Sequence, residues 1–157
     1  RSSDLGTVVT TAEADWNALM AVNVNGVFLG CKHAIPVMAR QGGGAIVNTA
    51  SAVANVGIHD RAAYVASKGA VAALTRAMAV DHVDQKIRIN AVAPGTILTP
   101  FHERYSTAEQ IKGMVATIPQ GRAGRPEEIA AAVDFLASER AAYVVGQAIA
   151  VDGGLTA

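Results

Sequence analysis

The sequence contains 157 residues, of which 51% are hydrophobic and 17% are charged, which predicts one domain (1–157) with a sizeable core and excludes a globally disordered chain. Its 13 basic and 13 acidic residues cancel, so it lacks the charge excess typical of proteins that bind nucleic acid or an anionic membrane surface. Apolar runs such as 45–47 and 91–93 are too short to span a bilayer, and Cys31 is the only cysteine. We therefore expect a protein of the reducing cytoplasm, with no nucleic-acid or membrane partner.

The expected elements alternate between helix and strand. In chain order they are a helix at 12–40, a strand at 45–49, a helix at 62–83, a strand at 86–93, a short helix at 108–116, a helix at 126–138 and a strand at 144–151. Acidic residues follow the cap candidate Thr11, Pro36 is expected to kink or interrupt the first helix, and Pro126 opens the last one. This alternation predicts an α/β fold with a parallel sheet covered by helices on both faces.

The segment Tyr64-Val-Ala-Ser-Lys68 places a phenol and an ammonium four residues apart on one helix face. A positive charge beside a phenol favours the phenolate and so makes a general acid/base that is usable near neutral pH. Ser51 follows the strand at 45–49 and lies 13 positions before Tyr64, at the strand end where parallel sheets bind ligands. Taken alone, Tyr64 and Lys68 are more typical of a surface pair, and Ser51 can equally be an ordinary loop serine.

Two further segments contain residues that are unusual for their position. Asn23 lies inside the first helix, where asparagine is mildly unfavourable, although a satisfied polar residue is the simpler interpretation. Gly95 ends the strand at 86–93 and is expected to adopt a backbone conformation that other residues avoid. The four histidines show no metal-ligand spacing, and the Gly-x-Ser-x-Gly elbow of hydrolases is absent, so we predict neither a metal site nor a hydrolase.

Together these motifs resemble the short-chain dehydrogenase/reductase family. Four residues match its catalytic tetrad in order and spacing: Asn23, Ser51, Tyr64 and Lys68. The segment 90–95 with Thr99 looks like its nicotinamide-side motif, and the segments 121–127 and 151–154 are similar to its C-terminal signatures. The resemblance covers about 11–154 and implies a Rossmann-like doubly wound parallel sheet, of which this chain supplies the C-terminal strands and helices.

The resemblance implies an oxidoreductase that moves hydride between NAD or NADP and a carbonyl or secondary alcohol. Tyr64 would exchange the proton with the substrate oxygen, and Lys68 would favour its phenolate and hold the ribose hydroxyls. Ser51 would orient the substrate, and Asn23 would hold a water that links Lys68 to solvent. The implied cofactor contacts are Asn23, Tyr64, Lys68, Pro94, Gly95, Ile97 and Thr99, with Ile97 and Thr99 at the carboxamide.

The family's glycine-rich turn for the pyrophosphate and its residue for choosing NAD or NADP are not found in the sequence. We therefore expect residues 1–157 to belong to a longer protein. Alone they are expected to be poorly soluble, because the strand at 45–49 is left at a sheet edge. Two alternatives stay open: a self-sufficient enzyme of this length, and a truncated, non-catalytic protein that binds a partner through its apolar helices.

Two last expectations concern partners. The helices at 12–40 and 62–83 carry small and apolar residues around much of their circumference, and in the family they pair across a two-fold axis, so we expect a homodimer or homotetramer. The loops at 52–61 and 97–120 are expected to border a small-molecule substrate. The polar residues of these loops can simply be solvated. If they face the substrate, they favour a sugar, sugar acid or hydroxy acid. They are His59, Asp60, Arg61, His102, Glu103 and Arg104.

Overall fold

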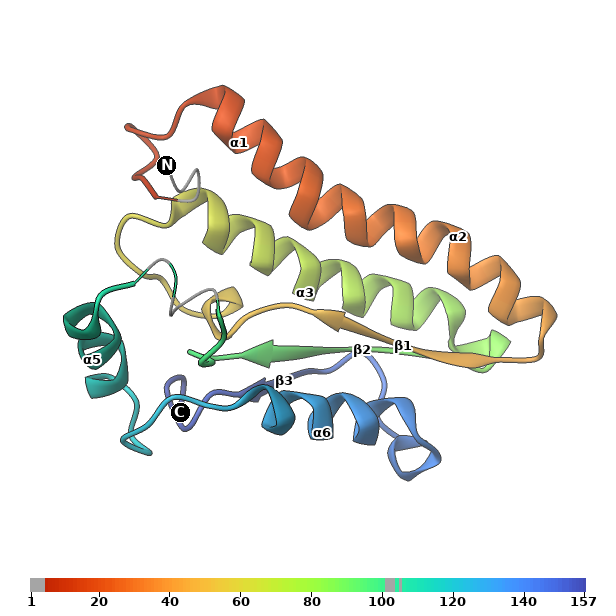
Figure 1. The fold of residues 1–157 in the computed structure, drawn as a ribbon. Helices are drawn as coiled ribbons and strands as arrows, with labels where there is room; N and C mark the ends of the chain where they lie inside the picture. Colours follow the sequence, from red (N-terminus) through yellow and green to blue (C-terminus); the bar gives the residue numbers. More distant parts are fainter. Residues whose placement is uncertain (1–4, 101–103, 105) are drawn as a thin grey trace.

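The computed structural model describes residues 5–100, 104 and 106–157 and contains a three-stranded parallel sheet in the order β1-β2-β3 (Figure 1). The strands are β1 (Gly44–Thr49), β2 (Ile87–Pro94) and β3 (Ala148–Val151). The helices are α1 (Glu13–Met20), η1 (Ala21–Asn25), α2 (Gly26–Arg40), η2 (Ala52–Ala54), α3 (Ala62–His82), η3 (Val83–Gln85), α5 (Ala108–Ala116), α6 (Pro126–Ala137) and η4 (Glu139–Ala141). The predicted α/β class is confirmed.

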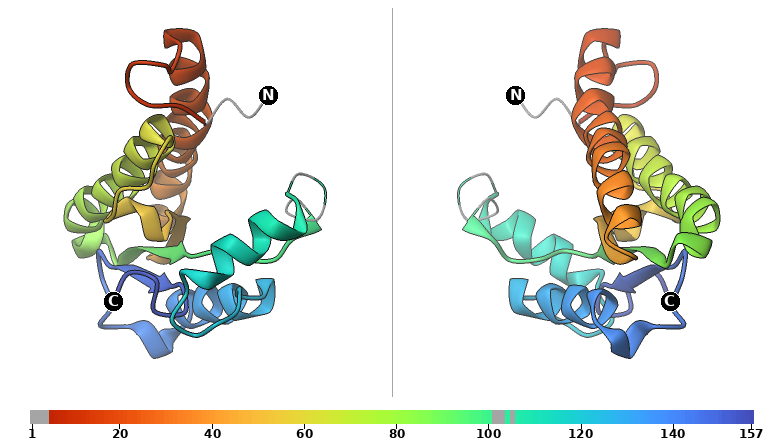
Figure 2. Two further views of the ribbon diagram at one scale, coloured as in Figure 1. Left: turned by 90° about the vertical axis from the view of Figure 1, so that its left-hand side faces the viewer. Right: turned by 90° about the vertical axis from the view of Figure 1, so that its right-hand side faces the viewer.

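Helices cover both faces of the sheet, as the alternation of elements predicts (Figure 2). On one face, α2 and α3 pack against the sheet through a cluster that includes Ile35, Met78 and Ile89. On the other face, Leu136 of α6 packs on Val92 of β2, and both are fully buried. β2 lies between these two layers, which explains why its side chains are buried along almost the whole strand.

The first long helix differs from the prediction. It continues through Pro36 to Arg40, and its α-helical pattern is interrupted instead by a π-helical turn at η1. Pro36 lies on the exposed side of α2, where water can satisfy the carbonyl that its missing N–H leaves unpaired. An interruption at Pro36 was therefore wrong, since the α-helical pattern changes at the turn that contains Asn23, while a kink at Pro36 stays a prediction.

The last strand is shorter than the predicted 144–151 and begins at Ala148. The preceding residues form a turn in which Gly146 has a φ of 71°. The side chain of Asn90 holds this turn, because its amide donates to the carbonyl oxygen of Val144 over 2.8 Å and its oxygen accepts from the amide of Gln147 over 2.9 Å. The Asn90 side chain thus joins this turn to β2, beside the backbone bond from the amide of Gly146 to the carbonyl oxygen of Ile89 over 3.0 Å.

The rod formed by α1, η1 and α2 (Glu13–Arg40) leaves much of its apolar surface exposed. It is 28 residues long and is apolar enough to cross a membrane by length and composition alone, a property that core helices of soluble proteins and signal sequences share. Val22 is 74% exposed, and Phe28, Leu29 and Val37 are each more than 40% exposed. Exposed apolar surface on this scale is typical of a face that packs against another protein surface.

Candidate active site

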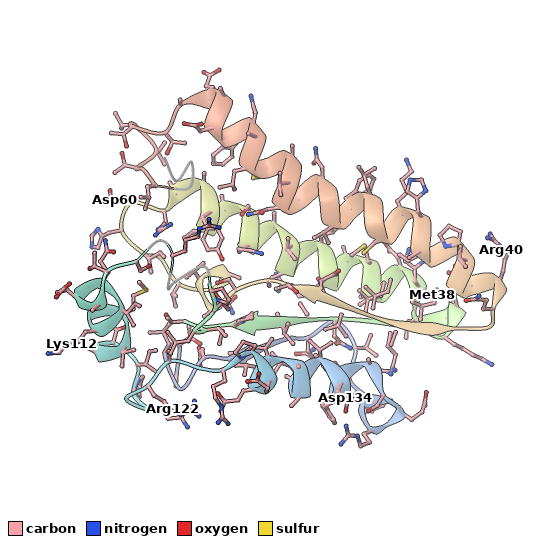
Figure 3. The ribbon with its side chains drawn as sticks, viewed as in Figure 1. Met38, Arg40, Asp60, Lys112, Arg122 and Asp134 are labelled. Carbon is pink, nitrogen blue, oxygen red and sulfur yellow. The ribbon has the colours of Figure 1, made fainter. Side chains whose placement is uncertain are left out.

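The predicted catalytic residues lie around the carboxyl ends of β1 and β2. Thr49 and Ser51 mark the end of β1, while Pro94 and Gly95 mark the end of β2, and the parallel register brings both ends to one edge of the sheet. Figure 3 labels Asp60 at this end of the molecule, near the start of α3, with Met38 and Arg40 at the other end. Ligands of open α/β sheets bind outside the carboxyl ends of the strands.

Tyr64 and Lys68 lie in the first two turns of α3, one above the other. The Lys68 Nζ atom donates to the carbonyl oxygen of Thr49 over 3.0 Å, and it lies 5.9 Å from the centre of the Tyr64 ring. Burial lowers the pKa of the Lys68 ammonium, since removal from water disfavours its charged form. The end of β1 therefore holds the ammonium beside the phenol ring, a link that the sequence spacing alone does not show.

Ser51 lies two residues beyond the end of β1 and is 8% exposed. It is the N-cap of η2, and its Oγ atom accepts a long hydrogen bond of 3.4 Å from the backbone amide of Val53. The short helix packs closely on α3, since the carbonyl oxygen of Ala54 lies 3.7 Å from where a Cβ atom would stand at Gly69. Ser51 is thus placed beside the helix that carries Tyr64, and its hydroxyl proton is left to donate.

Asn23 lies in the π-helical turn η1 and faces α3. Its side-chain amide donates over 3.0 Å to the Oγ atom of Ser67, and Ser67 in turn donates over 2.8 Å to the backbone carbonyl oxygen of Tyr64. Ser67 is fully buried. Sequence reasoning missed Ser67, although a serine next to Lys68 on a face otherwise made largely of alanine was a usable signal.

The loop after β2 forms the other wall at this end of the sheet. Its start is paired with β3, since the amide of Gly95 donates to the carbonyl oxygen of Val151 over 3.1 Å. Ile97 then forms an isolated bridge with Gly124, and Thr99 is half-buried just beyond it. The predicted contacts of this loop with a nicotinamide carboxamide stay a prediction.

Gly95 is required by space, not by the unusual backbone conformation expected from its position. The φ angle of Gly95 is not positive. A Cβ atom at this position would stand 2.8 Å from both the Cα and the Cβ atoms of Asp152. Any larger residue would push the end of β2 away from the turn after β3. The expected reason for this glycine was therefore wrong.

A bidentate ion pair joins Arg122 to Glu128 in the segment that pairs with the loop after β2. Arg122 donates to the two carboxylate oxygens of Glu128 over 2.6 and 2.8 Å, and the amide of Arg125 donates to the same carboxylate over 2.8 Å. These bonds lower the pKa of Glu128 to about 2, chiefly through the Arg122 hydrogen bond and next through the Arg125 amide. The pair lies beside the bridge between Ile97 and Gly124, so it stabilises the wall made by the loop after β2.

The ion pair between Arg122 and Glu128 is expected to make the free energy of unfolding depend on pH in the acidic range. A carboxyl whose pKa is lowered on folding contributes stability above its unfolded value and loses that contribution as the pH falls through the folded value. We expect Glu128→Gln to lower the melting temperature near pH 7, and the gap from wild type to close between about pH 4.5 and about pH 2. Thermal unfolding across this range tests it, with the exposed Glu127→Gln as control. A gap of constant size down to pH 2 would contradict the assignment.

The polar loop residues are only partly placed. His59 and Asp60 are exposed, and Asp60 has a φ of 55° with its carbonyl oxygen accepting from the amide of Gly6 over 2.7 Å. Arg61 is half-buried as the N-cap of α3, and Arg104 is exposed. His102 and Glu103 lie outside the described residues. The expectation that these six residues face a substrate therefore stays untested.

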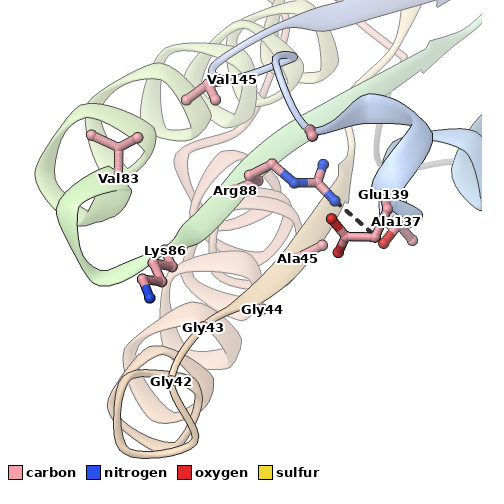
Figure 4. Close-up of a pocket in the computed structure, with 11 residues that line it drawn as sticks. Gly42, Gly43, Gly44, Ala45, Val83, Lys86, Arg88, Ala137, Glu139 and Val145 are labelled. Atoms are coloured by element: carbon pink, nitrogen blue, oxygen red, sulfur yellow. Dashed lines mark hydrogen bonds between the residues drawn. The ribbon is translucent and has the colours of Figure 1, made fainter.

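A hollow of about 610 Å³ lies at the opposite end of the sheet, where the strands begin (Figure 4). Its wall includes Gly44, Lys86, Arg88 and Glu139. The Arg88 guanidinium donates to the carbonyl oxygens of four residues at the end of α6 and in η4, namely Leu136, Ala137, Ser138 and Ala141. Arg88 thus caps a helix C-terminus and stabilises the fold. Size alone would point to this hollow, but none of the predicted catalytic residues lines it.

Within the described ranges, no three His, Cys, Asp or Glu side chains are gathered in a way that could hold a metal ion. The predicted residues at the carboxyl end of the sheet supply a phenol, an ammonium, a hydroxyl and an amide. This set can orient an oxygen and exchange a proton with it.

The chain is similar to several known proteins. Residues 2–156 match the family described as Enoyl-(Acyl carrier protein) reductase. The chain is 45% identical to 2-(R)-hydroxypropyl-CoM dehydrogenase of Xanthobacter autotrophicus, over 99% of this chain and 63% of that protein. The fold matches the crystal structure of levodione reductase with a TM-score of 0.93 and 35% identity, over 98% of this chain and 62% of that one. It also matches the aldohexose dehydrogenase of Thermoplasma acidophilum with a TM-score of 0.90 and 35% identity, over 97% of this chain and 63% of that one.

The fold is thus the Rossmann-type α/β fold of the dehydrogenases that it matches. The chain belongs to the short-chain dehydrogenase/reductase family. It spans about three-fifths of the relatives that it matches, 63% of the first and 62% of the next.

Proposed function

We propose that the protein is an NAD(P)-dependent oxidoreductase that interconverts a secondary alcohol and a carbonyl compound. The observation that carries the proposal is the placement of Tyr64 and Lys68 at the end of β1, with the ammonium held on the Thr49 carbonyl beside the phenol ring. A pair held in this way serves proton exchange with an oxygen, which is the half of the reaction that a protein must supply.

In the proposed oxidation, the phenolate oxygen of Tyr64 takes the hydroxyl proton of the substrate. Ser51 donates a hydrogen bond to the same substrate oxygen, because its Oγ atom already accepts from Val53 and its proton remains to donate. A bound nicotinamide supplies or accepts the hydride. Reduction runs the same proton steps in reverse, with Tyr64 as the acid.

The residues present suit the ribose and nicotinamide end of such a cofactor. The Lys68 ammonium has three N–H donors and gives one to Thr49, so two can reach ribose hydroxyls. Pro94 ends the neighbouring strand, and Gly95, Ile97 and Thr99 follow it, where the loop would border the carboxamide. We propose that Asn23 holds a water next to Lys68, which would connect the proton of Tyr64 to solvent.

For the substrate we propose a small, polar alcohol such as a sugar, sugar acid or hydroxy acid. The exposed His59 and Asp60 follow Ser51 in the chain and support a polar surrounding. One matched structure is named an aldohexose dehydrogenase and one relative a hydroxypropyl-CoM dehydrogenase, while another structure is named a levodione reductase. Two of these three names describe hydroxylated, polar substrates.

The experiment is a nicotinamide absorbance assay with NAD(H) and with NADP(H) on the purified longer protein to which residues 1–157 are expected to belong. The substrate panel holds aldoses, sugar acids, small hydroxy acids, cyclohexanol and a hydroxysteroid. We expect turnover with one of the polar groups, and preference for the steroid would overturn the substrate class. Absence of nicotinamide binding by calorimetry, together with absence of turnover, would favour the alternative of a non-catalytic protein.

We also propose that the protein pairs with a second copy of itself through the rod Glu13–Arg40 and α3. The exposed Val22, Phe28 and Leu29 on the rod and Val80 on α3 support this interface, since leaving them in water is unfavourable. We expect light scattering to give a dimer or tetramer. Val22→Asp with Leu29→Asp should shift the mass toward monomer, because each buries a charge in the interface. A wild-type monomer at micromolar concentration would refute the pairing.

A further inference from the structure

The fully buried hydroxyl of Ser67 joins the two parts of the candidate site. It accepts from the side-chain amide of Asn23 over 3.0 Å and donates to the backbone carbonyl oxygen of Tyr64 over 2.8 Å. Asn23 and Ser67 are 44 residues apart in the chain, and they come from η1 and α3. Ser67 is therefore the link between the turn of Asn23 and the turn that carries Tyr64 and Lys68.

The direction of these bonds decides how the Asn23 side chain is oriented. A serine hydroxyl has one proton, and that of Ser67 goes to the Tyr64 carbonyl oxygen, so its oxygen can only accept from Asn23. Asn23 must then present its NH₂ group, and not its Oδ1 atom, to Ser67. An amide in an apolar site without such a partner could adopt either orientation.

Packing alone does not require a hydroxyl at this position. Ser67, Val71 and Thr75 follow one another at four-residue steps along the same buried face of α3, where Ala63 and Ala72 are also buried. An alanine would fill the place of Ser67 without the cost of burying a polar group. Thr75 has a comparable buried hydroxyl, which accepts from the amide of Asn48 over 2.9 Å inside the core. Thr75 thus offers a matched comparison away from Asn23.

We propose that Ser67 is a positioning residue that fixes Asn23, and with it the π-helical turn η1, against the turn of α3 that carries Tyr64 and Lys68. The inference rests on the proposed oxidoreductase function, in which Asn23 holds the relay water. Ser67 itself touches no substrate, and it acts through Asn23 and through the turn of Tyr64.

The test is a double-mutant cycle with Ser67→Ala, Asn23→Ala and the double variant, assayed by kcat against pH and by the KM for nicotinamide. We expect Ser67→Ala to lower kcat roughly tenfold, to alter the pH profile as Asn23→Ala does, and to leave the nicotinamide KM within about twofold. In the Asn23→Ala background, Ser67→Ala should have little further effect on kcat, because the two residues act together. Ser67→Thr, which keeps the hydroxyl, should recover most of kcat.

Thr75→Ala is the control, since it removes a buried hydroxyl from the same face. We expect it to lower the melting temperature about as much as Ser67→Ala and to leave the shape of the pH profile unchanged. Independent, additive effects of Ser67→Ala and Asn23→Ala on kcat would overturn the proposal. The proposal would also be overturned if Ser67→Ala kept the wild-type pH profile while Asn23→Ala changed it.

Hydrogen exchange of the Asn23 side-chain amide, followed by NMR, separates this inference from the proposed function. Exchange should be slow in wild type and in Thr75→Ala, and at least tenfold faster in Ser67→Ala, because the amide loses its buried acceptor. If wild type shows no turnover, the proposed function fails while this measurement still decides whether Ser67 holds Asn23. Equal exchange in wild type and Ser67→Ala would remove the structural basis of the inference.

Discussion

Replacing Tyr64 by phenylalanine is expected to reduce kcat by about 10² to 10⁴, the range in which general acid/base catalysis contributes to enzyme rates. The substitution removes only the hydroxyl that would exchange a proton with the substrate. The ring, which lies 5.9 Å from the Lys68 Nζ atom, stays in place. Nicotinamide binding, measured by fluorescence titration, should therefore change by less than about threefold.

Tyr143→Phe is the matched control for this result. Tyr143 is fully exposed in the turn before β3 and lies away from the candidate site. The control variant should keep wild-type kcat and wild-type cofactor affinity. Residual activity of Tyr64→Phe above a few per cent of wild type would show that another group exchanges the proton, and the assignment of Tyr64 would then be wrong.

Lys68→Ala is expected to produce two changes together, because the ammonium serves both the ribose and the phenol. The dissociation constant of the nicotinamide should rise about tenfold or more, since a hydrogen bond to a charged group contributes about 1.5–3 kcal/mol. Activity that remains should move to higher pH, because the substitution removes the positive charge that is held on the Thr49 carbonyl beside the reacting oxygen. Calorimetry and a pH–rate profile measure the two changes.

Lys86→Gln controls for the loss of one positive charge. Lys86 is exposed at the start of β2, at the opposite end of the sheet from the candidate site. It should leave both the cofactor affinity and the pH profile unchanged. A Lys68→Ala protein with wild-type cofactor affinity would show that Lys68 is only a partly buried residue tied to the Thr49 carbonyl.

Much of the fold could be predicted because its signals are local. Short apolar stretches bounded by glycine or proline marked β1 and β2, and Pro126 with the acids after it marked the start of α6. The end of β3 was also predicted, whereas its start was not. That start depends on Asn90, whose side chain binds residues more than 50 positions away. No pattern within a short window contains such a bond.

The candidate site shows the same division. Sequence by itself determined the α/β class, the family and the spacing of Tyr64, Lys68 and Ser51, because a four-residue step on a helix and a strand end are properties of neighbouring residues. Only the tertiary structure decided that Asn23 lies in a π-helical turn tethered to Ser67.

Tertiary structure also decided that Lys68 is bound to the end of β1 and that Gly95 is needed for space and not for its φ. Each of these facts joins atoms of two elements that are distant in the chain. They depend on how helices and strands pack in three dimensions, since a buried donor must find its acceptor wherever the fold places one.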